Sequence, residues 1–148
     1  MNQKTHLAEL DFEIRIRKSF ERQQVMQLLN ARLVKVLPGE VQIELPYSPR
    51  ITQQHGYVHA GIITTIVDSA CGYAAYSLMP ADASVLSVEF KMNFLHPAEG
   101  EYFVGIGKVV KSGRTLTVCS GEMQAVNQDE SHVVALMQAT MISVKRVS

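Results

Sequence analysis

The chain has 148 residues, enough for one domain of ordinary size, and 47% of them are hydrophobic, as expected for a globular core. Fourteen basic and fourteen acidic side chains give a formal charge of zero, which argues against nucleic acid as a main partner. The two cysteines, Cys71 and Cys119, lie in apolar segments and indicate reduced core thiols, which excludes a disulfide framework.

The N-terminal segment predicts a helix. Residues 1–10 contain no apolar run behind basic residues, so we expect no signal peptide and a cytoplasmic protein. Asp11 is suited to cap a helix over about 12–30, which has one apolar side. The basic side chains of this helix are expected mostly on its outside: Arg15, Arg17, Lys18 and Arg22. We interpret them as a solvated face, with contact to an anionic ligand as the alternative.

Two short segments follow the helix. Residues 31–37 and 41–45 flank the turn Pro38-Gly39-Glu40, and the second segment alternates apolar with polar residues. This pattern predicts a β-hairpin. A loop then leads from Ser48 to Val58.

The segment from Ala60 to Leu78 predicts a long buried helix, because Asp68 is its only ionisable side chain and it is apolar on most sides. It is too polar to cross a membrane. The positions three and four residues from Asp68 are all small: Thr64, Thr65, Cys71 and Gly72. A buried carboxylate must be paired or hydrogen-bonded. A structural Asp68 would bond to Thr64 or to a backbone amide; a functional one would use the space beside it.

Four strands are predicted after Pro80, at 85–94, 102–111, 114–126 and 132–144. In the first of them we expect the apolar residues Leu86, Val88, Phe90, Met92 and Phe94 on one face, and Ser87, Glu89, Lys91 and Asn93 on the other. Ser112-Gly113 is expected to form a two-residue hairpin turn. A mainly antiparallel sheet covering one long helix is an α+β arrangement. The last two strands are less polar than the first, and residues 133–137 are apolar on both faces, so we expect a homo-oligomer.

The loop from Gln53 to Gly61 and the helix that follows it contain the candidate chemistry. The first turn of a helix has unpaired amides and a partial positive charge, which suits stabilisation of an oxyanion. Ala60 and Gly61 leave these amides accessible. Asp68 lies roughly 10–12 Å further along the axis, too far for one acyl carbon to touch both groups in one straight helix. The hypothesis is therefore a site shared between two subunits, with the amides from one and Asp68 from the other.

The pattern of these residues resembles a known family. The pattern consists of His59-Ala60-Gly61, then Asp68, then residues 87–90, 94–98 and 109–116 in this order. It is similar to that of the hotdog-fold acyl-CoA thioesterases. The resemblance is to the PaaI-type (phenylacetate-pathway) branch of the 4-hydroxybenzoyl-CoA thioesterase superfamily. It covers roughly 34–144, and implies one domain over 1–148 with a hotdog core at about 31–146. It also implies homodimers joined through a continuous sheet, commonly a dimer of dimers, with active sites at the subunit interface.

The resemblance also implies roles for individual residues. Asp68 matches the catalytic carboxylate, which acts as general base on water or as nucleophile. Ala60, with Gly61, matches the oxyanion contact from the neighbouring helix. Gln53 stands where the family has an Asn that places water, a role that Gln54 is also placed to take. Ser87 matches a hydroxyl that contacts this water, although an ideal strand would turn it away from the apolar face.

Other polar residues have weaker assignments. His59 is expected to hydrogen-bond the loop backbone or, in the alternative, to contact the thioester. His55 and His59 lack the third ligand of a metal site, so no metal is expected. Lys111 and Arg114 are candidates for binding the phosphates of coenzyme A. The simpler interpretation is that they lie at a solvated hairpin tip. Coenzyme A would be part of the substrate, and no separate cofactor is implied.

Three functions compete at this point. The first is hydrolysis of an aryl- or medium- or long-chain acyl-CoA. The second is non-catalytic binding of acyl-CoA, which the presence of Asp68 opposes, because a carboxylate beside an anionic ligand weakens binding unless it does chemistry. The third is a hotdog dehydratase or hydratase, which the central helix opposes because it offers no His to pair with Asp68.

Overall fold

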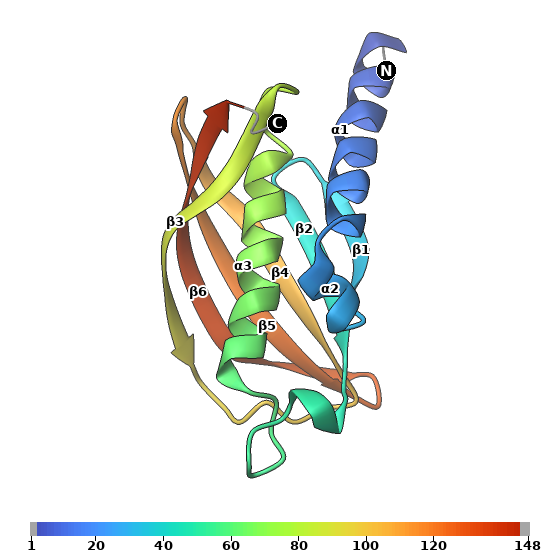
Figure 1. Cartoon of the computed structure of the whole chain (residues 1–148), viewed down its shortest axis with the longest axis vertical. Coiled ribbons are helices and arrows are strands. Elements are labelled where there is room, and N and C mark those ends of the chain that lie inside the picture. Colours follow the sequence, from blue (N-terminus) through green and yellow to red (C-terminus); the bar gives the residue numbers. More distant parts are fainter. Residues whose placement is uncertain (1–2, 146–148) are drawn as a thin grey trace.

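The computed structural model describes residues 3–145, with side chains described from residue 11 onward, and contains one six-stranded antiparallel sheet curved around a long helix (Figure 1). The strand order is β1-β2-β4-β5-β6-β3. The predicted α+β hotdog arrangement is therefore confirmed. The elements are α1 (Gln3–Glu21), α2 (Gln24–Leu28), β1 (Arg32–Leu37), β2 (Glu40–Pro46), α3 (Ala60–Tyr76), β3 (Ala83–Phe94), β4 (Tyr102–Ser112), β5 (Leu116–Asn127) and β6 (Glu130–Lys145), with a short 3-10 turn, η1 (Pro49–Ile51).

The helix α3 lies against the concave face of the sheet, and glycines on the strands allow its close approach. A Cβ built on Gly107 of β4 would lie 2.3 Å from the backbone of Ala70. On β5, a Cβ at Gly121 would lie 2.5 Å from Val67. Real carbon atoms do not approach so closely, so these positions exclude any side chain. They fix which face of α3 is turned to the sheet.

We expect Gly107→Ala to lower the free energy of unfolding by about 3 kcal/mol, because the added methyl group overlaps backbone atoms of α3 that cannot rotate away. Denaturant unfolding followed by circular dichroism measures the change. Ser120→Ala on the exposed face of the neighbouring strand is the matched control and should stay within about 0.5 kcal/mol of the wild type. An equally mild effect of Gly107→Ala would show that α3 is not held this close.

The prediction of one helix over 12–30, capped by Asp11, is wrong. The chain forms α1 from Gln3 and a separate α2, so Asp11 lies inside α1. Between the two helices Gln23 is extended, with φ −79° and ψ 98°. In a continuous helix Met26 would point about 120° away from Phe20, whereas the break lets both side chains enter the core.

Arg15 also differs from its predicted place on the outside of the helix. Its guanidinium donates to the carbonyls of Pro80 (2.8 Å), Met79 (3.1 Å) and Tyr76 (3.3 Å), at the C-terminal end of α3. It also lies 4.5 Å from the centre of the Tyr76 ring. The last carbonyls of a helix lack partners within the helix and carry partial negative charge. Arg15 therefore ties α1 to the end of α3.

A β-bulge in β3 changes the predicted faces of this strand. Ser87 pairs with Met141 and Glu89 with Thr140, which leaves Val88 as the extra residue. Ser87 therefore shares the inner face of the sheet with Phe90, whose partner on β6 is the buried Ala139. The strict alternation predicted for 85–94 would have turned Ser87 away from α3, and that prediction is wrong.

The expected two-residue turn at Ser112-Gly113 is also wrong. Ser112 pairs with Thr117, and the amide of Gly113 donates to the carbonyl of Leu116, which makes a four-residue turn. A two-residue turn occurs instead between β5 and β6, where Gln128 and Asp129 both have positive φ. The predicted hairpin of β1 and β2 and the long central helix are confirmed.

Cys71 on α3 and Cys119 on β5 are both free and fully buried, as predicted. Burial raises the pKa of the Cys119 thiol to about 11 and raises the pKa of Cys71 still further. Both thiols therefore stay protonated and act as core residues. Within residues 3–145, no helix is both long and apolar enough to span a membrane.

Candidate active site

Asp68 lies near the middle of α3 and accepts a hydrogen bond from Ser87. The distance from Ser87 Oγ to Asp68 Oδ1 is 2.7 Å. The carboxyl group is half-buried, and burial raises its pKa above the ordinary value for an aspartate, while the hydrogen bond from Ser87 acts in the opposite direction. A carboxylate that binds protons more tightly than usual is a stronger base.

Thr64 does not take the structural role considered for it. Its hydroxyl donates to the carbonyl of Ala60 at 2.8 Å, and the hydroxyl of Thr65 donates to Gly61 in the same way. The hydrogen-bond partner of Asp68 is therefore Ser87 on a different element, and the second carboxylate oxygen has no hydrogen-bond partner among residues 11–145.

The start of α3 leaves one amide free. His59 is the N-cap residue, and its Nδ1 accepts from the amide of Gly61 at 2.9 Å. The amides of Ile62 and Ile63 both donate to the His59 carbonyl. The amide of Ala60 has no acceptor in the part of the chain that the structure describes. Of the four unpaired amides that every helix start has, Ala60 alone is therefore available to a ligand.

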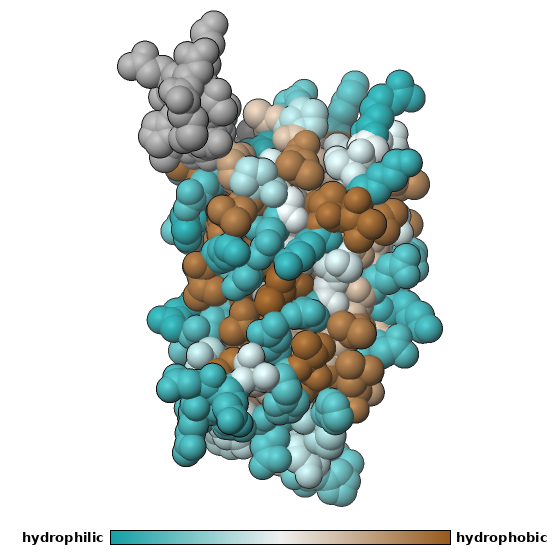
Figure 2. All heavy atoms as spheres, turned by 180° about the vertical axis from the view of Figure 1, so that it is seen from behind, coloured by the Kyte–Doolittle hydropathy of each residue, from teal (hydrophilic) through white to brown (hydrophobic). Residues whose placement is uncertain are grey.

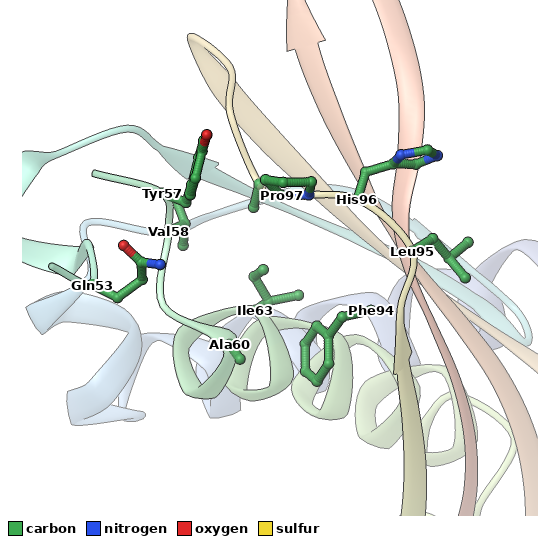
Figure 3. Close-up of a pocket in the computed structure, with 10 residues that line it drawn as sticks. Gln53, Tyr57, Val58, Ala60, Ile63, Phe94, Leu95, His96 and Pro97 are labelled. Atoms are coloured by element: carbon green, nitrogen blue, oxygen red, sulfur yellow. The ribbon is translucent and has the colours of Figure 1, made fainter. Parts of the chain in front are cut away.

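Ala60 lines a cavity of about 460 Å³ (Figure 3). The loop before α3 forms one side of the cavity, and the chain that follows β3 forms the other. Gln53 lines it, with its side-chain nitrogen turned toward the cavity in Figure 3, while its Oε1 accepts from the amide of His55. The cavity residues are Gln53, Tyr57, Val58, Ala60, Ile63, Phe94, Leu95, His96, Pro97 and Ala98. Gln54 is exposed and does not line it.

Asp68 lines a different cavity, of about 170 Å³, on the side of α3 that faces β3 and the N-terminal helices. Its lining is Ser19, Gln23, Asp68, Ser69, Gly72, Tyr73, Val85, Ser87 and Met141. Asp68 lies eight positions after Ala60 in α3, roughly 12 Å along the helix axis. Ala60 and Asp68 of one chain therefore line two separate cavities.

The other predicted residues lie elsewhere. Lys111 at the end of β4 and Arg114 in the turn before β5 are exposed, and neither lines the cavities beside Ala60 or Asp68. His55 is exposed in the loop before α3. Sequence reasoning missed Ser19 and Gln23, which enter the Asp68 cavity from the N-terminal helices. Their polar character gave no signal, because only the fold of α1 and α2 onto α3 brings them there.

A family model described as the thioesterase superfamily matches residues 55–132, a span that contains Ala60, Asp68 and Ser87. A crystal structure of a thioesterase family protein from Silicibacter pomeroyi is 50% identical, with a TM-score of 0.89 over 91% of this chain and 99% of its own. Human acyl-coenzyme A thioesterase 13 is 30% identical over 92 residues, which are 62% of this chain and 65% of that protein. The PaaI protein of the Escherichia coli phenylacetic acid degradation operon is 19% identical with a TM-score of 0.75 over 89% of this chain and 90% of its own, a likeness of fold.

Proposed function

Because this chain belongs to the thioesterase superfamily and is a thioester hydrolase, we propose that it cleaves an acyl-CoA thioester to the free acid and coenzyme A. The acyl group is an aryl group or a medium or long chain. Asp68 is the general base or the nucleophile. The observation that carries the proposal is the pair of groups that α3 presents, a half-buried carboxylate held by Ser87 and the free amide of Ala60.

The two groups suit the two needs of the reaction. The carbonyl oxygen of the thioester becomes negatively charged as the carbon is attacked, and the Ala60 amide donates a hydrogen bond to it. Asp68 either removes a proton from the attacking water or attacks the carbon itself to give an anhydride that water then opens. In both routes the C–S bond breaks, and the sulfur leaves as the thiol of coenzyme A after it takes up a proton. We propose that Gln53 orients water beside the Ala60 amide, which is supported by its position in the lining of the same cavity as Ala60.

We propose that each complete site contains Ala60 of one subunit and Asp68 of the other. The edge strand β3 supports this, because it is 12 residues long and exposes apolar side chains, with Val88 53% and Phe90 44% exposed. Long apolar edge strands pair with another chain. Ser87 lies at the Asp68 cavity and Phe94 at the Ala60 cavity. Antiparallel pairing of two β3 strands about an axis near Phe90 would bring these two half-sites together.

The outer face of the sheet supports a second contact between copies of the chain. Figure 2 shows apolar side chains among polar ones on the molecule's back face. Leu86, Ile142 and Leu116 are register neighbours on β3, β6 and β5, and Leu86 and Leu116 are exposed. We propose a dimer of dimers that covers this row.

Lys111 and Arg114 remain our candidates for binding the phosphates of coenzyme A. The cytoplasm remains our proposed location for the protein.

The experiment that tests the function is release of free thiol from aryl-, medium-chain and long-chain acyl-CoA esters by the purified protein. We expect hydrolysis of at least one ester with kcat/KM above about 10⁴ M⁻¹ s⁻¹, the lower part of the range for enzymes on their own substrates. Calorimetric titration with a non-hydrolysable acyl-CoA thioether is the control. Binding of the thioether without hydrolysis of any ester would favour the non-catalytic alternative.

We expect Ser87→Ala to move the acid limb of the pH profile of kcat/KM to higher pH. Asp68 must be ionised to act, so the rate falls as the pH falls through its pKa. The Ser87 hydroxyl stabilises the ionised form, and its loss leaves burial to raise the pKa further. Initial rates at a series of pH values measure the limb, with Ser131→Ala on exposed β6 as the control. A limb that moves to lower pH would contradict the assignment.

A further inference from the structure

Met141 of β6 lies beside the hydroxyl group that holds Asp68. It pairs with Ser87 of β3, and it is fully buried on the inner face of the sheet. Ser87 Oγ is 2.7 Å from Asp68 Oδ1 and 3.4 Å from the sulfur atom Sδ of Met141. The bulge at Val88 turns Ser87 to this face. The hydroxyl of Ser87 therefore lies between two acceptors, a carboxylate and a thioether.

The Ser87 hydroxyl has one proton to donate, and the charge of Asp68 decides which acceptor receives it. A hydroxyl group both donates and accepts hydrogen bonds, whereas a thioether sulfur only accepts them, and weakly. A hydrogen bond to an ionised carboxylate is roughly twice as strong as one between neutral groups. While Asp68 is ionised, we therefore expect Ser87 to donate to Asp68, with little contribution from the Met141 sulfur.

Protonation of Asp68 reverses this hydrogen bond. The new O–H group of Asp68 can donate to Ser87 Oγ, and the Ser87 hydroxyl then needs a different acceptor for its own proton. Within residues 11–145 the hydroxyl bonds to Asp68 and Met141, so Met141 Sδ is the acceptor in place. Ser87 is exposed on the edge strand β3, where water competes with the sulfur. The proposed pairing of two β3 strands, together with a bound ester, would exclude this water.

Asp68 has no charged neighbour among the described residues that line its cavity. Tyr73 is the only other titratable residue of this lining, and Cys71 lies three residues after Asp68 on α3. Burial raises the pKa of both groups, so both are neutral at pH 7. Glu89 of β3 lies on the other face of the sheet, where it accepts from Thr140 of β6. The charged side chains of α1 border a neighbouring hollow instead: Asp11, Arg15, Lys18, Glu21 and Arg22.

We propose that Met141 is a positioning residue: its sulfur accepts a hydrogen bond from Ser87 when Asp68 becomes protonated, so that one hydroxyl stabilises Asp68 before and after proton transfer. The inference rests on the proposed function, in its general-base route. A proton of the attacking water moves to Asp68, the new O–H group donates to Ser87 Oγ, and the Ser87 hydroxyl rotates toward Met141 Sδ. The hydroxyl rotates back when Asp68 gives its proton to the leaving sulfur of coenzyme A. No covalent bond to Met141 forms or breaks.

The experiment is the pH profile of kcat for Met141→Leu, which reports the ionisation of Asp68 with the ester bound. Without the sulfur, protonated Asp68 is less stable and its pKa is lower, so the acid limb should move to lower pH by about half a unit. Ser87→Ala is expected to move the limb in the opposite direction. The rate on the plateau should fall less than about threefold, because Asp68 becomes a slightly weaker base. Thiol release from the best ester measures both quantities.

Two controls separate this hydrogen bond from the packing of β6. Met137→Leu makes the same change at a buried side chain on the same face of the strand, four residues away, and should keep the wild-type limb. In the Ser87→Ala background, Met141→Leu should move the limb no further, because the sulfur acts only through the hydroxyl. Leucine has nearly the volume of methionine, so the Tm of Met141→Leu should fall by no more than about 5 °C. Met141→Ile, which also lacks an acceptor, serves as a second variant with the same expected shift.

Two results would overturn the inference and leave the proposed function standing. One is an acid limb of Met141→Leu that stays in place or moves to higher pH. The other is a shift that persists when Met141→Leu is combined with Ser87→Ala, which would assign the effect to the polarity of the cavity. Absence of hydrolysis of every ester by the wild type would instead remove the proposed function, and the role of Met141 with it.

Discussion

Asp68→Asn is expected to lower kcat/KM for the best ester by at least about a hundredfold, the loss typical of removing an essential acid–base group. The amide that replaces the carboxylate keeps nearly the same shape and still accepts the hydrogen bond from Ser87. It has no ionisable oxygen to take a proton from water or to attack the thioester. Thiol release under saturating and limiting ester concentrations measures the loss.

The same substitution should not weaken the fold. Burial raises the pKa of Asp68 in the folded chain above its ordinary value, so the folded state binds this proton more tightly than the unfolded state. The ionised carboxylate therefore destabilises the fold at pH 7, and this cost disappears as the pH falls below the ordinary pKa of aspartate. Asn carries no charge, so the Tm of Asp68→Asn at pH 7 should equal or exceed that of the wild type. Full activity in this variant would refute the assigned mechanism, and a large fall in Tm would assign Asp68 to the fold.

Ala60→Pro is expected to lower kcat about 10²- to 10³-fold, as removal of one oxyanion donor does in other enzymes. Proline lacks the amide hydrogen and is well accepted at the first position of a helix. Ala60 occupies this position in α3, and the preceding His59 is already extended, with φ −60° and ψ 136°, as a residue before proline should be. The change therefore removes the free amide and little else. Ala60→Ser, which keeps the amide, is the control and should retain most of the activity.

Mixing the two inactive variants tests whether the site is shared. If Ala60 and Asp68 of different subunits form one site, a heterodimer of Ala60→Pro and Asp68→Asn chains has one site with both defects and one with neither. Random re-association of equal amounts after mild denaturation should then restore about a quarter of the wild-type activity, because half of the dimers are mixed and each has one intact site. A site within one chain would give no recovery.

Residue patterns were sufficient to predict the antiparallel sheet and the buried helix, because these depend on hydrophobic periodicity. They also singled out Asp68 as a candidate, because it is the one acid in an apolar segment. The place of Ser87 could not be predicted, since it depends on the bulge at Val88, and nothing in the alternation of β3 marks an extra residue. The sequence also could not show which of the two amides, that of Ala60 or that of Gly61, is free. Both residues are small enough to leave their amides accessible, and only the structure shows that the Gly61 amide already donates a hydrogen bond to the His59 ring.

The N-terminal helices illustrate a second limit. The apolar residues from Phe12 to Leu29 suit one long helix, and the break at Gln23 depends on how Phe20 and Met26 both reach the core. This break places Gln23 beside Ser69. Gln23 and Ser19 of the predicted solvated helix therefore line the cavity at Asp68. Packing of these helices against the core therefore outweighed the local preference of residues 12–29 for one continuous helix.

The pairing of β3 has a consequence for the order in which this chain acquires its structure during synthesis. Among residues 3–145, β3 pairs with β6 and with no other strand, and Ser87 pairs with Met141, 54 residues later. A ribosome that adds about 5–20 residues per second needs several seconds to make this stretch, and in that time β3 has no partner strand. The Asp68–Ser87 contact is thus among the last to form, and the nascent chain carries an unprotected apolar strand that chaperones would be expected to recognise.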